Sequence, residues 1–247
     1  MDYGHDFAGL TAVVTGAGSG IGLATAQQLA ARGATVFGFD IAAGDMAGVA
    51  TWVSCDIGDS ASVAAAFASL SKLDILINNA GISAVGSVET ATDEEWARVL
   101  NVNVVGLART SRNALPLLRK SSVAAIVNTC SVAATAGIPM RAIYSATKGA
   151  VLSLTMAMAN DFLADGIRVN CVNPGTADTP WVKRLLSQAA DPVLERAKLE
   201  ARQPMGRLVS ADEVASAICY LASPAQGSTT GTSLAVDGGM QGLRIPK

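Results

Sequence analysis

Tyr144, Lys148 and Ser131 are the residues of this chain whose types and spacing could do chemistry. Tyr144 and Lys148 stand four residues apart in the run Tyr-Ser-Ala-Thr-Lys, and Ser131 precedes Tyr144 by thirteen residues. Residues four apart share one face of a helix, so the ammonium would lie beside the phenol and stabilise its anion. A phenol held in this way can act as an acid or a base nearer neutral pH. The spacing therefore predicts proton transfer by Tyr144.

A glycine-rich turn near the start of the chain lies between a predicted strand and a predicted helix. The strand is Leu10–Thr15, the turn is Gly16–Gly22, and the helical pattern runs from Leu23 to Arg32. The turn reads T-G-x-x-x-G-x-G rather than the literal G-x-G-x-x-G, because residue 21 is Ile. Glycines let the backbone approach a pyrophosphate, and a helix N-terminus offers unpaired N–H groups to it. This segment therefore predicts a dinucleotide site.

Asp40 ends the next predicted strand, Thr35–Phe39, eighteen residues after Gly22. A carboxylate at this place can accept hydrogen bonds from both hydroxyls of an adenosine ribose, and its charge repels a 2'-phosphate. No Lys or Arg occurs between Arg32 and Lys72 to hold such a phosphate. The sequence therefore predicts NAD rather than NADP as the cofactor.

The chain resembles the NAD-preferring branch of the short-chain dehydrogenase/reductase family over essentially its whole length. The motifs that carry the resemblance follow one another in order: Thr15–Gly22, Asp40, Asp56, Asn78-Asn79-Ala80-Gly81, Asn103, Ser131, Tyr144 with Lys148, and Pro174-Gly175. The resemblance implies a catalytic tetrad of Asn103, Ser131, Tyr144 and Lys148. It also implies that Asn103, through a main-chain distortion and a bound water, connects Lys148 to solvent.

The same resemblance implies which residues hold the cofactor. Asp56 would bind the adenine amine, and Asn79 would line the cofactor cleft and brace the sheet. The full set of expected cofactor-binding residues is Gly16, Ser19, Gly20, Ile21, Gly22, Asp40, Asp56, Ile57, Asn79, Ala80, Gly81, Tyr144, Lys148, Pro174, Gly175, Thr176 and Thr179.

Two features depart from the common pattern of that family. Cys130 replaces a serine that often precedes Ser131, but the thirteen-residue interval to Tyr144 selects Ser131, and a buried thiol behaves mostly as a small hydrophobe. The segment Ile41–Thr51 is too short for a full helix between strands. That brevity is similar to a compact subgroup that includes cytosolic 3-hydroxybutyrate-type and bacterial sugar-acid dehydrogenases, although substrate does not follow from such likeness.

Composition narrows the class of protein. The 247 residues are 50% hydrophobic and 15% charged, with a net charge of -2, which gives no basic surface for nucleic acid or a membrane. The four scattered cysteines and the single histidine, His5, match no metal site. The cysteines indicate reduced thiols in a cytoplasmic protein. The beginning of the chain has no signal-peptide pattern, and no apolar run is long enough to span a membrane.

The element pattern predicts an α/β fold. Seven expected strands alternate with helices: Leu10–Thr15, Thr35–Phe39, Thr51–Cys55, Leu73–Asn78, Val123–Thr129, Ile167–Asn173 and Ser233–Val236. Several are apolar on both faces, as in a parallel sheet covered on both sides. We therefore expect residues 1–247 to form one Rossmann-like, doubly wound, seven-stranded domain that binds NAD and carries the catalytic residues. Expected helices at Thr92–Lys120 and Ala142–Ala164 are apolar on more than one face, which predicts a homotetramer.

The stretch of about 176–205 has the features of a substrate lid. It carries Pro180, Pro192 and Pro204 with helical runs between them. The cations of this stretch are Lys183, Arg184, Arg196, Lys198 and Arg202, and Arg141 lies three residues before Tyr144. An arginine grips a carboxylate through two bonds, so Arg141 and Arg202 are the expected substrate anchors.

These features together favour an enzyme that oxidises or reduces a CH–OH group. The expected reaction moves a hydride between NAD and a secondary alcohol or ketone, of a 3-hydroxybutyrate type or a 2-keto-3-deoxy sugar acid. One alternative is a reductase of 3-oxoacyl thioesters, against which Asp40 argues because such reductases commonly use NADPH. Another is a non-catalytic NAD-binding regulator, against which the intact tetrad argues.

Overall fold

The computed structural model describes residues 3–187 and 189–244, and its centre is one parallel sheet. The strands are β1 Thr11–Thr15, β2 Thr35–Asp40, β3 Thr51–Ser54, β4 Ile75–Asn78, β5 Ala125–Thr129, β6 Arg168–Pro174 and β9 Ser233–Val236. They lie in the order β3-β2-β1-β4-β5-β6-β9, and every pairing is parallel. The expected seven-stranded, doubly wound α/β fold is therefore confirmed.

Burial along the strands explains the parallel arrangement. All residues of the central strands β4, β5 and β6 are buried, whereas the edge strands β3 and β9 are partly exposed. A sheet covered on both faces can be made of near-continuous apolar runs, which is what β4 (Ile-Leu-Ile-Asn) and β5 (Ala-Ile-Val-Asn-Thr) supply. Polar residues follow where these strands end, at one edge of the sheet.

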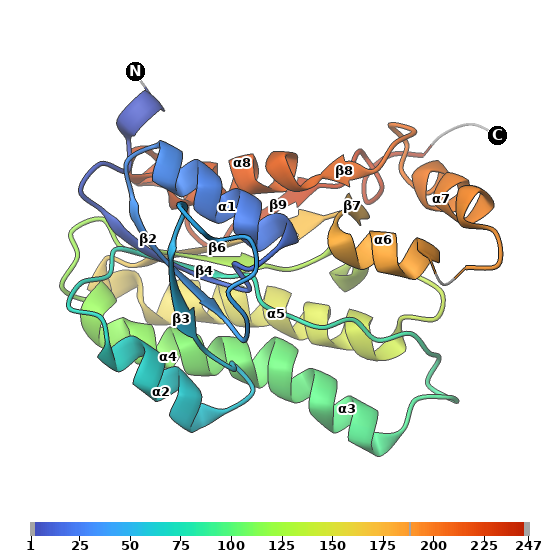
Figure 1. Ribbon diagram of the computed structural model, residues 1–247, viewed down its shortest axis with the longest axis horizontal. Helices are drawn as coiled ribbons and strands as arrows, with labels where there is room; N and C mark the ends of the chain where they lie inside the picture. Colours follow the sequence, from blue (N-terminus) through green and yellow to red (C-terminus); the bar gives the residue numbers. More distant parts are fainter. Residues whose placement is uncertain (1–2, 188, 245–247) are drawn as a thin grey trace.

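Helices cover both faces of the sheet (Figure 1). Helices α1 Gly20–Ala31 and α8 Ala211–Ala222 pack on one face, and α2 Ser60–Ala68, α4 Leu107–Leu118 and α5 Ala142–Asp161 on the other. Each layer has its own apolar core, one around Val14, Leu29 and Ile218 and one around Phe67, Leu118 and Ile126. Short helical turns complete the chain at Tyr3–His5, Val132–Ala134, Leu163–Asp165 and Pro224–Gln226. No helix in the described ranges is both long enough and apolar enough to cross a membrane.

The expected single helix Thr92–Lys120 is wrong in one respect, because it is interrupted. Helix α3 Asp93–Leu100 leads into a π-helical segment, Asn101–Gly106, and then into α4. A π-turn inserts one residue per turn and shifts the helix face that follows it. Apolar periodicity alone hid this change, since both α3 and α4 remain amphipathic. The interruption contains Asn103.

A buried amide pair fixes the helices that lie over the sheet. Asn78 Nδ2 donates to Asn128 Oδ1 on the neighbouring strand (2.9 Å) and to Ser111 Oγ on α4 (3.0 Å). Thr110 Oγ1 donates to Asn78 Oδ1 (2.6 Å), and Asn128 Nδ2 donates to Thr155 Oγ1 on α5 (2.9 Å). Because buried polar groups are costly without partners, this network favours one placement of α4 and α5 over the sheet.

The 176–205 segment lies at one end of the sheet and has a small core of its own (Figure 1). It contains β7 Ala177–Asp178, α6 Pro180–Ser187 and α7 Pro192–Ala201, and β7 pairs with β8 Val209–Ser210. Val182, Leu199 and Leu208 form the core between these elements. Arg196 is bonded to Asp178 (2.9 Å) and Glu200 (2.9 Å), so it braces the segment internally.

Arg168 is a buried cation that holds the end of α8, and its replacement should destabilise the fold. Its guanidinium donates to the carbonyls of Leu221 (2.7 Å), Ala222 (3.2 Å), Ser223 (3.1 Å) and Thr229 (3.3 Å). Arg168→Met removes every one of these donors, and buried carbonyls left unpaired cost about 1–3 kcal/mol each. We expect a loss of about 3 kcal/mol or more, measured by denaturant or thermal unfolding.

Arg119→Met is the matched control for this prediction. Arg119 pairs with Asp165 at 2.8 Å, but its side chain is 50% exposed, so its removal should cost less than about 1 kcal/mol. Equal effects of the two substitutions would contradict the role given to Arg168.

Candidate active site

A cavity of about 820 Å³ opens where the parallel strands end, and it gathers nearly every residue singled out from the sequence. The expected residues that line it are Gly16, Ser19, Gly20, Ile21, Asp40, Asp56, Ile57, Asn79, Ala80, Gly81, Ser131, Arg141, Tyr144, Lys148, Pro174, Gly175, Thr176, Thr179 and Arg202. Gly22 and Asn103 do not line it. Both lie behind the lining residues and hold them.

The glycine turn brings the start of α1 to the cavity. Gly16 (φ 67°) and Gly20 (φ 57°) have left-handed backbone conformations, which side chains disfavour. Gly22 packs against the turn so closely that a Cβ there would lie 2.0 Å from the carbonyl oxygen of Gly16. The requirement for glycine at position 22 is therefore one of packing.

The first turn of α1 suits an anion. It has no acidic residue, and its N-cap residue Ser19 makes no capping hydrogen bond through its side chain. By contrast, Asp59 caps α2 and Ser210 caps α8 through their side chains. The N–H groups at the start of α1 can therefore serve a bound group such as a pyrophosphate.

Thr15 and Asn79 join the glycine turn to the end of β4. The Thr15 hydroxyl accepts from the backbone N–H groups of Asn79 (2.9 Å) and Ala80 (3.0 Å). Asn79 Nδ2 in turn donates to the carbonyls of Thr15 (3.1 Å) and Gly16 (3.3 Å). The floor of the cavity is thus set by hydrogen bonds between these two side chains and the backbone at the ends of two neighbouring strands.

Two carboxylates stand at the β2 end of the cavity. Asp40 Oδ2 accepts from the backbone N–H of Gly18 (2.9 Å), and Asp56 Oδ1 accepts from that of Gly58 (2.7 Å). The other oxygen of Asp40, Oδ1, accepts a longer bond from the N–H of Ala42 (3.4 Å), so the backbone orients both carboxylates. Such a carboxylate can accept hydrogen bonds from hydroxyl or amino groups of a ligand.

Tyr144 and Lys148 lie next to each other on α5, as their spacing predicted. Lys148 Nζ is 5.6 Å from the centroid of the Tyr144 ring and donates to the carbonyl of Thr129 (2.7 Å). Lys148 is buried, with 6% of its surface exposed, and has no carboxylate within salt-bridge distance among the described residues. A buried ammonium without an acidic partner stabilises negative charge on a neighbouring phenol.

Ser131 faces the same cavity from the end of β5. Its Oγ accepts from the backbone N–H of Ala133 (3.1 Å), which leaves the hydroxyl proton free to be donated. Cys130 also lines the cavity, and its thiol donates to the carbonyl of Lys148 (3.1 Å). Cys55, Cys130, Cys171 and Cys219 are all buried, and none of them is in a disulfide.

Asn103 positions the loop that follows β4. Its Oδ1 accepts from the N–H of Ile82 (2.8 Å), and its Nδ2 donates to the carbonyl of Ile82 (2.8 Å) and to Thr147 Oγ1 (3.2 Å). Asn103 lies inside the π-helix, Asn101–Gly106. A Cβ on Gly81 would lie 3.2 Å from Asn103 Oδ1 and 3.9 Å from Lys148 Nζ, so Gly81 keeps these two side chains close.

Three arginines line the opposite end of the cavity: Arg141, Arg184 and Arg202. Arg141 is half-buried, donates to the carbonyl of Ala84 (3.2 Å) and lies over the ring of Trp181 (5.6 Å). Burial and the nearby charge of Arg202 lower the pKa of Arg141. An anion bound between these side chains would offset both the loss of solvation of Arg141 and its repulsion from Arg202.

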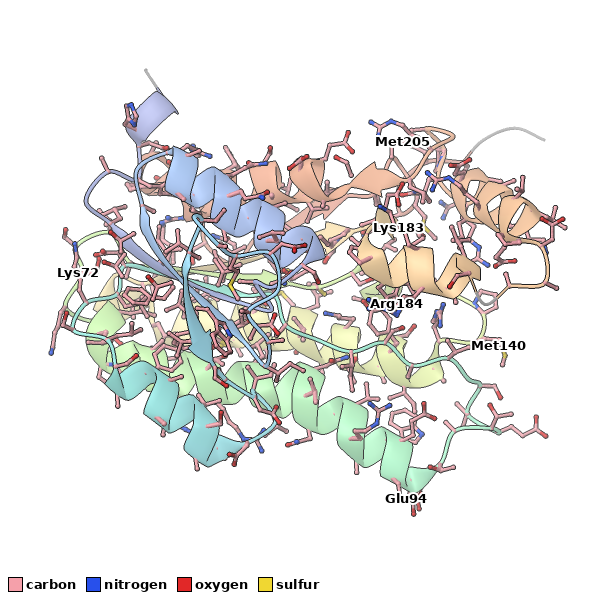
Figure 2. The ribbon with its side chains drawn as sticks, in the orientation of Figure 1. Lys72, Glu94, Met140, Lys183, Arg184 and Met205 are labelled. Carbon is pink, nitrogen blue, oxygen red and sulfur yellow. The ribbon has the colours of Figure 1, made fainter. Side chains whose placement is uncertain are left out.

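Sequence reasoning did not distinguish Arg184 from the other cations of the 176–205 segment. Lys183, Arg196 and Lys198 do not line the cavity, whereas Arg184 does, on the side of α6 that faces α5 (Figure 2). Trp181 and Met240 also line it and were missed. Helical spacing gave one usable signal, because Trp181 and Arg184 are three residues apart and share a face of α6.

Arg109 links the Asp56 loop to the π-helix. Its guanidinium donates to Ser60 Oγ (2.9 Å), the carbonyl of Ile57 (3.3 Å) and Asn101 Oδ1 (2.8 Å). Asn101 Nδ2 donates to the carbonyl of Gly58 (3.0 Å). The two side chains therefore tie the loop beside the acidic end of the cavity to the helix turn that holds Asn103.

Comparison with known proteins matches the chain over nearly its full length. The family model described as Enoyl-(Acyl carrier protein) reductase matches residues 16–241. Cis-4-hydroxycyclohexanecarboxylate dehydrogenase of Sinomonas cyclohexanicum is 43% identical, over 96% of this chain and 98% of the relative. The 2-keto-3-deoxy-L-fuconate dehydrogenase of Xanthomonas campestris pv. campestris is 35% identical, over 94% of this chain and 80% of the relative.

A solved structure gives the same result for the fold. The ligand-free aldohexose dehydrogenase of Thermoplasma acidophilum superposes with a TM-score of 0.91 at 32% sequence identity, covering 98% of this chain and 99% of that protein. The agreement therefore extends to the elements that surround the cavity.

The bridge made by Arg109 generates a prediction about the Asp56 loop. Arg109→Met removes its hydrogen bonds to Ser60, Ile57 and Asn101, so backbone amides of residues 56–60 should exchange with solvent deuterium roughly tenfold faster, equivalent to about 1.4 kcal/mol. Hydrogen exchange read by mass spectrometry measures this. Arg112→Met, on the exposed side of the same helix, is the control and should leave exchange unchanged. If exchange is unaltered in Arg109→Met, the stability of the loop at residues 56–60 does not depend on Arg109.

Proposed function

This chain belongs to the short-chain dehydrogenase/reductase family, and we propose that within it the protein is an NAD-dependent oxidoreductase of small hydroxy acids or sugar acids. The observation that carries the proposal is the meeting of Tyr144, Lys148 and Ser131 in one cavity that also has carboxylates at one end and arginines at the other. A nicotinamide cofactor, when bound, takes up or supplies the hydride.

The residues of the chain supply the proton transfer. Tyr144, as phenolate, removes the hydroxyl proton of the alcohol, and in the reverse direction it protonates the carbonyl oxygen. Ser131 has a free hydroxyl proton that holds the substrate oxygen next to Tyr144. Lys148 stabilises the phenolate and is itself held by the Thr129 carbonyl, while Asn103 keeps the Ile82 loop in place.

Asp40 supports NAD as the cofactor. One of its oxygens is bonded to the N–H of Gly18 at 2.9 Å, and the carboxylate lines the cavity beyond the glycine turn. A 2'-phosphate brought to this place would meet a fixed negative charge and no lysine or arginine from the neighbouring chain segments. The same argument disfavours a thioester reductase that uses NADPH.

Arg141, Arg184 and Arg202 support a carboxylate on the substrate. Arg141 is partly desolvated and is bonded to a carbonyl rather than to an acid, so its charge is available. The 176–205 segment brings the other two cations over the cavity, and we propose that it acts as a lid. The relative that is 43% identical is named for a substrate with both a hydroxyl and a carboxylate.

A homotetramer is the assembly we propose. Large apolar side chains remain exposed on α3, the π-helix and α5, namely Leu100 (36%), Val105 (44%) and Met156 (52%). Pairing of these helices with their copies around twofold axes would cover them.

The preference for NAD over NADP tests the cofactor assignment. Turnover with NAD should exceed that with NADP by about tenfold or more, because one unfavourable charge contact of about 1.4 kcal/mol gives that factor. Initial rates with both cofactors measure it, and Asp40→Ala with Ile41→Arg should narrow the gap. Equal rates with NAD and NADP for the unaltered protein would refute the assignment.

Loss of the phenol tests the chemistry. Tyr144→Phe should lower kcat by about 100-fold or more, the range typical of a lost general acid or base, with little change in NAD affinity. Lys148→Ala should lower both kcat and the affinity for NAD. Tyr220→Phe, on an exposed tyrosine of α8 away from the cavity, is the control and should keep full activity. Near-native turnover by Tyr144→Phe would remove Tyr144 from the mechanism.

Loss of Arg141 tests the carboxylate anchor. A charge-assisted hydrogen bond is worth about 1.5–3 kcal/mol, so Arg141→Ala should raise KM for an acidic substrate about ten- to a hundredfold. An uncharged alcohol measured in parallel should show little change in KM. Lys198→Ala is the matched control, since Lys198 lies on the lid but outside the cavity. If the best substrate is uncharged, the hydroxy-acid assignment fails.

A further inference from the structure

The wall of the cavity near the arginines is made mostly of apolar side chains. Those that line it there come from four parts of the chain: Val132, Ile138, Trp181, Leu185, Leu199 and Met240. Ser131 and Tyr144 are reserved for the reacting oxygen in the proposed function. Among the described lining residues outside the expected cofactor site, the neutral polar side chains left for further hydroxyls of a substrate are Ser83, Trp181 and Thr129, besides the thiols of Cys55 and Cys130. The Thr129 hydroxyl already donates to Asn79 Oδ1 (3.3 Å).

Packing holds this wall in place. Leu199 is buried with Val182 and Leu208, and Leu185 packs against the same core, so α6 and α7 present their apolar faces as one unit. Trp181 is stacked against the Arg141 guanidinium at 5.6 Å.

Met240 comes from the far end of the chain and is set by a separate turn. The Asp237 carboxylate accepts from the N–H groups of Gly239 (2.9 Å) and Gln241 (2.8 Å), on either side of Met240. Asp237 is itself buried, with 6% of its surface exposed. The turn therefore fixes the chain around Met240, and the wall offers a constant apolar surface to whatever lies between Tyr144 and the arginines.

An apolar wall between the reaction centre and the arginines determines which chemical groups are favoured in the part of the substrate between its alcohol and its carboxylate. A hydroxyl buried there without a partner loses its hydrogen bonds to water, whereas a methylene gains from leaving water. We propose that the substrate is a hydroxy carboxylate whose body between alcohol and carboxylate is aliphatic, or alicyclic, rather than a polyhydroxylated sugar acid. This inference rests on the proposed function and chooses between the two substrate classes that it leaves open.

Two six-carbon acids with the same carboxylate and the same reacting alcohol test this. They are 5-hydroxyhexanoate and 2,3,4,5-tetrahydroxyhexanoate, which differ only at the three carbons between the C5 alcohol and the carboxylate, and they are assayed with NAD by formation of NADH. We expect kcat/KM to be about tenfold or more higher for 5-hydroxyhexanoate, because an apolar pocket discriminates against added hydroxyls by up to about a hundredfold each. Values within threefold of each other, or a preference for the tetrahydroxy acid, would overturn the inference.

A third compound keeps this result separate from the proposed function. If hexan-2-ol is oxidised and neither acid is, the carboxylate anchor fails and the proposed function fails with it. If both acids are oxidised equally well, the proposed function stands and the apolar-body inference fails.

A substitution in the wall gives a second readout. Leu185→Asn places an amide in the cavity and should narrow the preference for 5-hydroxyhexanoate by about threefold or more. Val193→Asn is the control, since Val193 lies on α7, is 80% exposed and does not line the cavity. A preference that Leu185→Asn leaves unchanged, in a variant with an unaltered Tm, would contradict the role of the wall. Should Leu185→Asn fold poorly, Met240→Gln makes the same test from another segment.

Discussion

The hydrogen bond between Asn78 and Asn128 is the interaction on which the site most depends. These two amides sit opposite each other on β4 and β5, fully inside the protein, and each uses a remaining group to bind a helix. Asn78 binds Thr110 and Ser111 of α4, and Asn128 binds Thr155 of α5. A buried amide without a partner is expensive, so the sheet accepts these helices in only one register. Helix α5 carries Tyr144 and Lys148, and α4 follows directly from the turn that carries Asn103.

Charge is distributed along the cavity by the same framework. The carboxylates of Asp40 and Asp56 follow β2 and β3, on one side of the glycine turn, while Arg141, Arg184 and Arg202 stand beyond the catalytic helix. In the proposed function, this arrangement would align a ligand pair that has hydroxyls at one end and a negative charge at the other.

The lid is joined to the cofactor side by a buried glutamine. Gln203 has 1% of its surface exposed, and its Nε2 donates to the carbonyls of Thr176 (3.3 Å) and Arg207 (2.7 Å). Its amide therefore connects the end of α7 with the chain that follows Pro174-Gly175. Gly175 is needed there because a Cβ would lie 2.3 Å from Gln203 Oε1.

Local sequence determined the elements and the chemistry of this protein. The apolar runs gave all seven strands, the glycines gave the turn before α1, and the four-residue interval gave the contact between Tyr144 and Lys148, because each of these depends on backbone geometry over a few residues. The place of Asp40 was equally predictable from the sequence, because Asp40 follows a predicted strand and the carboxyl ends of these strands were expected at one edge of the sheet. These predictions needed no knowledge of how distant segments pack.

Tertiary structure decided what depends on packing between distant segments. The π-helix at Asn101–Gly106 left the apolar periodicity intact, so only the fold revealed it. The lid cations are alike in sequence, and the packing of α6 and α7 alone turned Arg184 and Arg202 to the cavity while it bonded Arg196 to Asp178. Met240 joined the wall from more than ninety residues beyond Tyr144. A pattern along the chain determines which residues share one face of an element. The surface that this face contacts is determined only when the elements pack together.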